Sequence, residues 1–403
     1  MASQGDPPYL PEPFEDSTIL ELLDSISFPH PTSIQFMNVI AFYHLLYKLS
    51  FPSEVIASKL PLHARKPTGT TTELILRVAG EHIPKIKTEN EAAVITWVRN
   101  NTKVPVPSIV HFDSSCSNAL KCEYIILTLC PGQNLGDLCN SMGAPEIDSI
   151  LDQIADILVE LHQQPWTHIG GLHFSPAGDI VPGPLLEETF CYVTNSERYW
   201  GPEEHYEEIS LVTGPFYTYV DYITAHLRKC IWYIHNRPKT LQPLLLPLIP
   251  RVKALLPILA SKASSLNDVK LRLAHKDIHF ANLLYDPSTQ NLTGLVDWEF
   301  SGVVPFTKWN PVMSFPWNGR KTKKDFLRTR PLYGRFEERC KERGLDWLLQ
   351  DAQFKSRDQE EMQKATDLLQ TIIAMRIKGY KDIMPRMEGW LKDLELCLEY
   401  FGV

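Results

Sequence analysis

The stretch LAHKDIHFANLLYDPSTQNLTGLVDWEFSG, residues 273–302, decides the fold. It contains two short apolar runs, LLYD and LTGLV, separated by PSTQN, whose Pro, Ser and Asn residues are typical of a turn. The pattern predicts a loop, a strand, a turn, a second strand and a second loop. Since the outer ends of an antiparallel strand pair are neighbours, we expect Asp277 and Asn282, before the first strand, to lie close to Asp297, after the second.

The three side chains have a chemistry in common. Carboxylate and amide oxygens are the ligands that Mg²⁺ prefers. The order His-x-Asp-x-x-x-x-Asn, followed about fifteen residues later by Asp, is the arrangement that kinases use. In that arrangement Asp277 orients the attacking hydroxyl and can accept its proton, while Asn282 and Asp297 hold the metal ions. Each residue alone would more often cap a turn, but their joint spacing favours the catalytic interpretation.

Three neighbouring side chains have open or structural interpretations. We expect His275 to hold the loop by hydrogen bonds, without transferring protons. His279 could contact either the loop backbone or Asp297, and we interpret it as structural. Glu299 fits a direct metal contact and a supporting carboxylate about equally well.

Length and composition set the class of protein. The chain has 403 residues, of which 44% are hydrophobic and 22% charged, so a sizeable globular core is expected. The formal net charge of −8 argues against nucleic acid as a partner, because phosphate binding favours a basic patch. The N-terminal sequence does not resemble a secretory signal, and no run reaches 18 apolar residues, so we expect no membrane partner. Eight scattered cysteines without a CxxC pair predict reduced thiols in a cytoplasmic protein and no zinc site.

Periodicity divides the chain into three parts. Residues 1–14 are rich in proline and polar residues, which predicts a flexible N-terminus. Residues 15–131 alternate strands with one marked helix at 88–101, which predicts a small α+β N-lobe; the resemblance given below implies that this lobe binds nucleotide. Pro131 and Gly132 break this pattern and are the expected hinge. Residues 132–403 are mainly helical and form a larger C-lobe that contains the catalytic loop and the acceptor site. Helices are expected near 16–26, 147–161, 216–235, 243–261, 322–343, 358–379 and 385–400, with a hairpin or loop excursion in 168–185.

The quoted stretch resembles the aminoglycoside phosphotransferase and choline kinase superfamily. HKDIHFANLL stands where its members read H-G-D-x-H-x-x-N, and DWEFSG where they place D-x-E. The blocks LRVAG, ENEAAVITWVRNNTKVPVPSIVHFD, ILTLCPGQNLGDL and HIGGL resemble successive blocks of fungal-type members, over about residues 35–312. The resemblance implies a bilobal protein-kinase-like fold whose N-lobe has an antiparallel sheet plus one helix. It implies ATP and Mg²⁺ as cofactors and a small molecule, aminoglycoside-like, choline-like or a natural product, whose hydroxyl is phosphorylated.

The nucleotide side needs a cation and a carboxylate that holds it. Arg77, in the predicted strand ELILRVAG, is the expected cation, and its planar fork suits both a carboxylate and a phosphate. Glu91 shares the apolar face of the predicted helix with Val94 and Ile95, whereas Glu89 does not, so we expect Glu91 to be the partner. The alternative is a capping box between Thr88 and Glu91.

The hinge supplies the remaining nucleotide contacts. By resemblance, adenine would lie against Thr128, Leu129 and Cys130.

Two features leave alternatives open. Residues 30–51, where a phosphate-binding loop is expected, contain no glycine to let backbone amides approach phosphate. The alternative function is therefore a kinase-fold pseudoenzyme or binding module; a protein kinase is disfavoured because no A-P-E block follows DWEF. Aromatic and acidic residues in 199–210, together with Trp309 and Trp317, could hold a cationic amine, although such runs more often pack a loop against the core.

Overall fold

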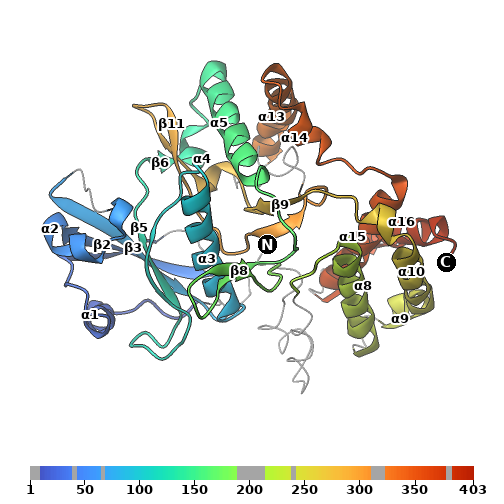
Figure 1. The fold of residues 1–403 in the computed structure, drawn as a ribbon, viewed down its shortest axis with the longest axis horizontal. Helices are drawn as coiled ribbons and strands as arrows, with labels where there is room; N and C mark the ends of the chain where they lie inside the picture. Colours follow the sequence, from blue (N-terminus) through green and yellow to red (C-terminus); the bar gives the residue numbers. More distant parts are fainter. Residues whose placement is uncertain are drawn as a thin grey trace.

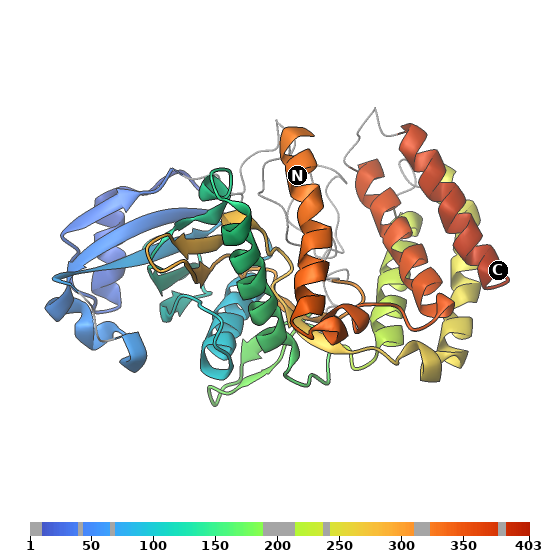
Figure 2. The ribbon, with the colours of Figure 1, turned by 90° about the horizontal axis from the view of Figure 1, so that it is seen from above.

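The computed structural model describes residues 10–38, 43–64, 69–187, 214–236, 242–309, 323–377 and 384–403. These residues form three parts in a row: a β-rich lobe, a central part crossed by long helices, and a group of helices near the C-terminus (Figures 1 and 2). The bilobal α+β architecture predicted from the sequence is confirmed. The larger lobe, however, contains two separate hydrophobic cores.

The N-terminal lobe is built on a five-stranded antiparallel sheet with the strand order β1-β2-β3-β5-β4. Strand β3 lies in the middle of this sheet, and its side chains alternate between the two faces. On one face Leu74, Leu76 and Val78 are fully buried. Ile75 and Arg77 point to the other face. The strands are β1 (Ser33–Phe36), β2 (His44–Pro52), β3 (Thr71–Ala79), β4 (Ile109–Asp113) and β5 (Tyr124–Thr128).

Helices cover both faces of this sheet. Helix α1 (Asp16–Ser25) packs Ile19, Leu22 and Leu23 against the sheet face that carries Leu74 and Leu76 of β3. It follows Glu15, which makes no side-chain capping hydrogen bond. Helix α3 (Ile86–Asn101) covers the other face, and the short helix α2 (Ser53–Ile56) follows β2.

The central part contains the catalytic hairpin. Strands β10 (Leu283–Asp286) and β11 (Asn291–Leu295) are antiparallel, as predicted, and β6 (Gln133–Asn134) extends them to three strands. Strands β9 (Leu271–Ala274) and β12 (Gly302–Pro305) form a second pair that flanks the catalytic segments. The predicted excursion at 168–185 is the hairpin of β7 (Leu172–Phe174) and β8 (Ile180–Pro182). The helices of this part are α4 (Leu135–Leu138), α5 (Ala144–His162), α13 (Lys323–Glu342) and α14 (Asp346–Gln350).

Helix α3 belongs to the core of the central part as much as to the sheet. One hydrophobic cluster runs from Val94 and Val98 of α3 to α5, the catalytic hairpin and α13. Asn90 adds two buried hydrogen bonds: its side-chain amide donates to the Ser301 carbonyl (2.9 Å), and its Oδ1 accepts from the Leu172 amide (2.9 Å). A Cβ at Gly171 would lie 2.4 Å from that Oδ1, so the second glycine of HIGGL is required for this contact.

A third part consists of helices that close a core of their own. Buried residues of α8, α10, α15 and α16 form a separate hydrophobic cluster, and Leu271 packs against both this cluster and the central one. The helices are α8 (Tyr219–Asn236), α9 (Gln242–Leu245), α10 (Ile249–Ser261), α11 (Ala263–Leu266), α15 (Arg357–Ile377) and α16 (Met384–Tyr400).

One stretch of this helical part is long and apolar. Residues 243–261 have a mean hydropathy of 1.6 and could cross a membrane by length and composition alone, which the sequence patterns did not suggest. In the structure, Leu245, Val252, Leu255 and Leu259 of this stretch lie in the core of the helical part, as in a core helix of a folded domain.

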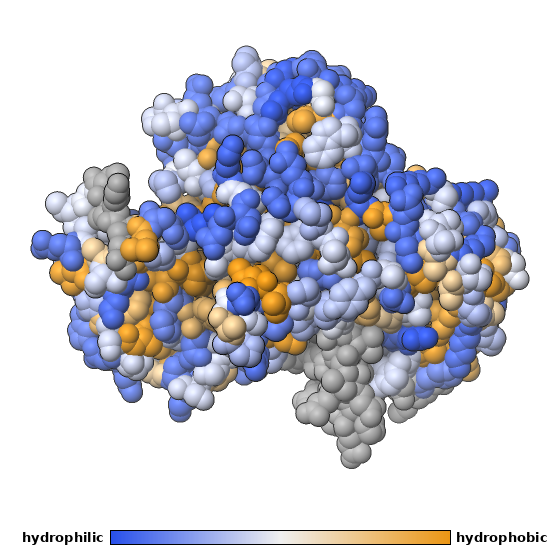
Figure 3. All heavy atoms as spheres, in the orientation of Figure 1, coloured by the Kyte–Doolittle hydropathy of each residue, from blue (hydrophilic) through white to orange (hydrophobic). Residues whose placement is uncertain are grey.

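Ion pairs fix the position of α13 on α5. Two arginines of α13 and the residue directly after the helix, spaced four residues apart, pair with three aspartates of α5 at the same spacing: Arg335 with Asp148, Arg339 with Asp152 and Arg343 with Asp156. Hydrophilic residues accordingly dominate the surface over α5 and α13 at the top of Figure 3. Exposed pairs contribute little individually, about 0–1 kcal/mol each, so the repeated spacing matters mainly for register.

The expected hinge lies against the catalytic hairpin. Gly132 has φ +101, and a Cβ there would lie 2.5 Å from Thr293 Oγ1, so a larger residue does not fit. The same hydroxyl donates to the Pro131 carbonyl (2.5 Å). The division into lobes at this point remains a prediction.

We predict that Asn90→Ala lowers the free energy of unfolding by about 2–4 kcal/mol, because it leaves the buried Ser301 carbonyl and Leu172 amide without partners. Urea denaturation followed by circular dichroism measures the change. Asn101→Ala, at the exposed end of the same helix, is the control and should change stability by less than about 1 kcal/mol. Equal effects of the two substitutions would contradict the role of Asn90.

Candidate active site

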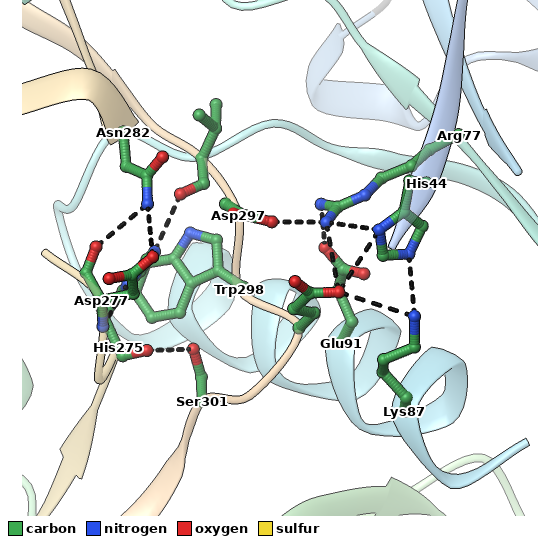
Figure 4. A network of polar contacts seen from close by, with 12 residues as sticks. His44, Arg77, Lys87, Glu91, His275, Asp277, Asn282, Asp297, Trp298 and Ser301 are labelled. Carbon is green, nitrogen blue, oxygen red and sulfur yellow. Dashed lines mark hydrogen bonds and ion pairs between the residues drawn. The ribbon is translucent and has the colours of Figure 1, made fainter. Parts of the chain in front are cut away.

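Arg77 joins three elements that are distant in sequence. Its guanidinium is 8% exposed, and Nη1 donates to Glu91 Oε1 of α3 at 2.5 Å. Its Nη2 forms an ion pair with Asp297 Oδ1, in the loop after β11 (Figure 4). Burial alone would lower the pKa of Arg77, but the charges of Glu91, Asp297 and Glu299 outweigh burial and raise it. The guanidinium is therefore a fixed positive charge that binds the sheet, the helix and the catalytic segment together.

The choice of Glu91 over Glu89 agrees with this geometry. Glu91 is fully buried against Arg77, whereas Glu89 accepts a hydrogen bond from the Ser114 hydroxyl (2.9 Å). Helix α3 begins at Ile86, so the alternative capping box with Thr88 is wrong. Burial raises the pKa of Glu91, and the nearby Arg77 charge opposes this shift.

Backbone and histidine contacts shape the loop before β10. His275 Nε2 donates to the Val296 carbonyl (2.8 Å), and its Nδ1 accepts from the Asp277 amide (3.3 Å). Burial lowers the pKa of His275 to about 4, which keeps the imidazole neutral with one donor and one acceptor nitrogen. The expected loop-holding role of His275 is confirmed. The Val296 amide donates to the Asn282 carbonyl (3.0 Å), so the two catalytic segments are also joined through their backbones.

Asp277 and Asn282 are brought together directly. The Asn282 side-chain amide donates to the Asp277 carbonyl (3.0 Å) and to Asp277 Oδ2 (3.3 Å). His279 accepts from the Ala281 amide at Nδ1 (3.2 Å), and its Nε2 lies 3.4 Å from Asp277 Oδ2. Of the two contacts considered for His279, the structure therefore shows the one with the loop backbone.

Asp297 is held in a sparsely populated backbone conformation. Its φ is +72, which is unfavourable for a residue with a Cβ and is tolerated where surrounding contacts impose it. The next residue, Trp298, is fully buried, and its indole donates to the Leu295 carbonyl (2.8 Å). Burial by itself would raise the pKa of Asp297, but Arg77 outweighs it and holds the pKa below its ordinary value. The side chain is therefore an ionised carboxylate beside Arg77.

The oxygen atoms at this site fit a magnesium ion. Since Nδ2 of Asn282 faces Asp277, its Oδ1 is the atom available to a cation. Asp297 uses Oδ1 for Arg77, and none of the described residues hydrogen-bonds its Oδ2. An amide oxygen and an ionised carboxylate are hard ligands of the kind that bind Mg²⁺ through few protein groups.

A second buried group behind Arg77 was missed by the sequence analysis. Lys87 Nζ lies 3.5 Å from Glu299 Oε2 and 3.4 Å from His44 Nε2, and His44 Nδ1 lies 3.3 Å from the same Glu299 oxygen (Figure 4). Burial, assisted by the Asp297 charge, raises the pKa of Glu299, whereas the Lys87 and Arg77 charges oppose this shift and favour its carboxylate form. Burial, together with Arg77 and Lys87, lowers the pKa of His44 well below its usual value. A signal for Lys87 existed, since it lies four residues before Glu91 and therefore on the same helix face.

Thr128 is the last residue of β5, and Cys130 lies two residues beyond it. Among the described residues, neither side chain contacts another predicted site residue. The Thr128 hydroxyl accepts from the Ser108 amide (2.8 Å), and the Thr128 amide donates to the Ser108 carbonyl (3.0 Å). Cys130 is half-buried beside Gly294, and burial raises the pKa of its thiol to about 11. An adenine contact at these residues remains a prediction.

Most of the expected acceptor-binding aromatics lie outside the described residues. This holds for 199–210 and for Trp317, and also for residues 39–42 of the glycine-free segment. Trp309 follows β12, and its indole nitrogen is buried without a hydrogen-bond partner among the described residues.

We predict that Arg77→Met lowers the free energy of unfolding by about 3–5 kcal/mol, because it leaves Glu91 buried without a cation. The double substitution Arg77→Met with Glu91→Met should recover most of this loss, since both members of the buried pair are then apolar. Urea denaturation of the two variants and the wild type measures the difference. A double variant as unstable as Arg77→Met alone would contradict the pairing.

The sequence and structure were compared with known proteins. A model of the phosphotransferase enzyme family (APH) matches residues 64–307, more than half of the chain. Among curated proteins, the subtelomeric hrmA-associated cluster proteins of two Aspergillus fumigatus strains, Af293 and CEA10, are each 23% identical over 260 residues. These matches cover 54% of this chain and 50% of each relative, so the chain spans about half the length of the curated relatives it matches.

Solved structures of aminoglycoside phosphotransferases align at low similarity. The gentamicin complex of APH(2″)-IIa has a TM-score of 0.49 and 11% identity, over 95% of this chain and 96% of that one. ADP-bound APH(2″)-Ib has a TM-score of 0.49 and 12% identity, over 96% and 97%. Similarity at this level carries no information about what this chain binds. The extent of the family match decides the assignment: the chain belongs to the phosphotransferase enzyme family.

Proposed function

We propose that this protein transfers the γ-phosphate of ATP, in the presence of Mg²⁺, to a hydroxyl group of a small molecule. The observation that carries the proposal is the meeting of Arg77 with Glu91 and Asp297, beside a loop in which Asn282 faces Asp277. These contacts gather at one site a fixed cation, two oxygen ligands and a carboxylate that can serve as a base.

Each residue has a defined task in this proposal. Asp277 orients the acceptor hydroxyl and accepts its proton as the new bond from oxygen to phosphorus forms and the bond from phosphorus to the ADP oxygen breaks. Arg77 presents its charge to the phosphates, and Glu91 fixes its orientation. Bound Mg²⁺ would be held by Asn282 and Asp297 and would neutralise charge on the phosphates. Because such a transition state needs little covalent chemistry from the protein, positioning and charge account for most of the rate.

The class of acceptor is part of the proposal. A polar small molecule, aminoglycoside-like, choline-like or a natural product, is favoured by the resemblance of HKDIHFANLL and DWEF to small-molecule kinases. The seven described cysteines are free thiols, which suits the reducing and ATP-rich cytoplasm that we propose as the location. We propose neither nucleic acid nor a membrane as a partner.

The experiment that tests the function has two stages. Calorimetric titration with a non-hydrolysable ATP analogue, with Mg²⁺ and then with EDTA, tests nucleotide binding and its dependence on metal. A screen of hydroxylated and amine-bearing small molecules with ATP, analysed by mass spectrometry, then tests phosphate transfer. Absence of metal-dependent binding of the analogue would contradict the proposal.

Two observations favour a second candidate, a kinase-fold binding module without transfer activity. No glycine occurs in residues 30–51, and Arg77 occupies one oxygen of Asp297. The module would bind an acceptor-like ligand, but titration with the ATP analogue would give no metal-dependent heat of binding. The first stage of the experiment therefore separates the two functions.

For the enzyme, we predict that Asp277→Asn lowers turnover by roughly 10²–10⁴-fold, because the amide cannot accept the hydroxyl proton. The amide keeps the size of the carboxylate, so the thermal midpoint should stay within a few degrees of that of the wild type. Asp179→Asn, an exposed aspartate beside the β7–β8 hairpin, is the control for loss of one carboxylate. Turnover of the Asp277 variant equal to that of the control would remove the proposed role.

A further inference from the structure

Lys87 is a second buried cation in the wall of the site. It lies one helical turn before Glu91 on α3 and is 1% exposed, which is rare for a lysine without charged or polar partners. Its partners are Glu299, at 3.5 Å, the ring of His44, at 3.4 Å, and the face of Tyr43, whose centroid lies 5.5 Å away. The side chain therefore points inward, toward the segment that follows Asp297 (Figure 4).

Glu299 lies between two cations. Its Oε2 is 3.5 Å from Lys87 and 3.7 Å from Arg77 Nη2, and the His44 ring contacts the same oxygen at 3.3 Å. Arg77 therefore has three carboxylates within reach, those of Glu91, Asp297 and Glu299. Lys87 contacts Glu299 alone among these three. Because Glu299 pairs with Lys87, Arg77 remains available to pair with Glu91 and Asp297, the two carboxylates that orient it in the proposed reaction.

His44 connects this arrangement to the phosphate-loop position. It is the first residue of β2, lies within the glycine-free segment 30–51, and is 5% exposed. Its Nδ1 lies 3.0 Å from Arg77 Nη2, and its Nε2 faces Lys87. The imidazole thus fills the space between the two cations and separates them.

We propose that Lys87 is a positioning residue of the phosphate site. By holding Glu299 in the wall of the cleft, it keeps Arg77 directed at Glu91 and Asp297, and it makes Glu299 a partner of Lys87 rather than a ligand of the metal. This inference rests on the proposed function, because the phosphate site is where Arg77 would act. It also assigns the carboxylate of DWE, for which the sequence allowed two roles.

The physical reason is the competition for one guanidinium. Without Lys87, Arg77 is the cation nearest to Glu299, and a buried carboxylate strongly favours a charged partner. Arg77 would then turn toward Glu299 at the expense of Glu91 or Asp297. Removing Glu299 as well would remove the competitor and return Arg77 to its original partners.

Three variants and one control test this idea. Lys87→Met removes the charge and keeps the length of the side chain, and Lys87→Arg restores a charge. Lys87→Met with Glu299→Gln removes both members of the pair. Lys85→Met, an exposed lysine two residues away at the start of the same helix, is the matched control. Calorimetry with a non-hydrolysable ATP analogue at saturating Mg²⁺, followed by titration of Mg²⁺ at fixed analogue, measures nucleotide and metal affinity in the whole chain.

We expect Lys87→Met to weaken binding of the Mg²⁺–analogue complex by about 10-fold or more, since it misdirects a buried charge. Lys87→Arg and the double variant should return to within about 3-fold of the wild type, and Lys85→Met should not differ from it. The rescue by a second substitution is what distinguishes positioning from a general loss of packing.

Several outcomes would overturn the inference. Unchanged binding in Lys87→Met shows that Arg77 does not depend on Lys87. A double variant at least 10-fold weaker than the wild type, with its Mg²⁺ titration shifted, makes Glu299 a metal ligand. If Lys87→Met alone does not fold, the double variant and Lys87→Arg are each compared with the wild type by the same titrations. Absence of analogue binding in the wild type would instead contradict the proposed function, so the two failures are distinguishable.

Discussion

A charged guanidinium buried between a sheet, a helix and a catalytic loop is the constraint on which this molecule depends. Arg77 cannot leave water without carboxylate partners, because an isolated buried charge costs several kcal/mol or more. Glu91 and Asp297 supply them, the latter 220 residues further along the chain. The energetic need to pair one cation therefore links the segment of Asp297 to strand β3, so that the fold and the proposed active site share the same contact.

The position of helix α3 follows from a second set of contacts. Asn90 joins it to the backbone of β7 and of the segment after Asp297, and its apolar face belongs to the core of the central part. Neighbouring residues of one helix thus have opposite tasks: Asn90 fixes the helix to the C-terminal lobe, and Glu91 fixes the cation of the N-terminal lobe. The helix that carries Glu91 is consequently held in place by packing and by the two hydrogen bonds of Asn90.

The catalytic hairpin and the Arg77–Glu91 pair were predictable from the sequence because their signals are local. Two apolar runs around a turn make the segment of Asp277 and Asn282 a neighbour of the segment of Asp297, as the Val296–Asn282 backbone hydrogen bond shows. A carboxylate on an apolar helix face requires a cation. The start of α3 was misread because the spacing of Thr88 and Glu91 imitates a cap, while packing extends the helix to Ile86.

Lys87 and His44 were missed for a different reason. Their partner Glu299 is more than two hundred residues away, and no local pattern reports such a contact. The division of the larger lobe into two cores was missed on the same grounds, since it depends on which distant helices pack together. The spacing of Lys87 and Glu91 places Lys87 on the buried face of its helix, but no spacing rule pairs it with Glu299.

The separate core of the C-terminal helices has a consequence for how such proteins diversify. Ile86 and Phe300, next to Lys87 and Glu299, pack against this core. Energetic effects of substitutions that share no neighbours add independently, so changes in α8, α10, α15 and α16 that do not contact Ile86 or Phe300 largely spare the buried charges around Arg77. A lineage can therefore accumulate variation in this block of helices without redesigning the apparatus for phosphate transfer. The architecture separates what must be inherited intact from what is free to drift.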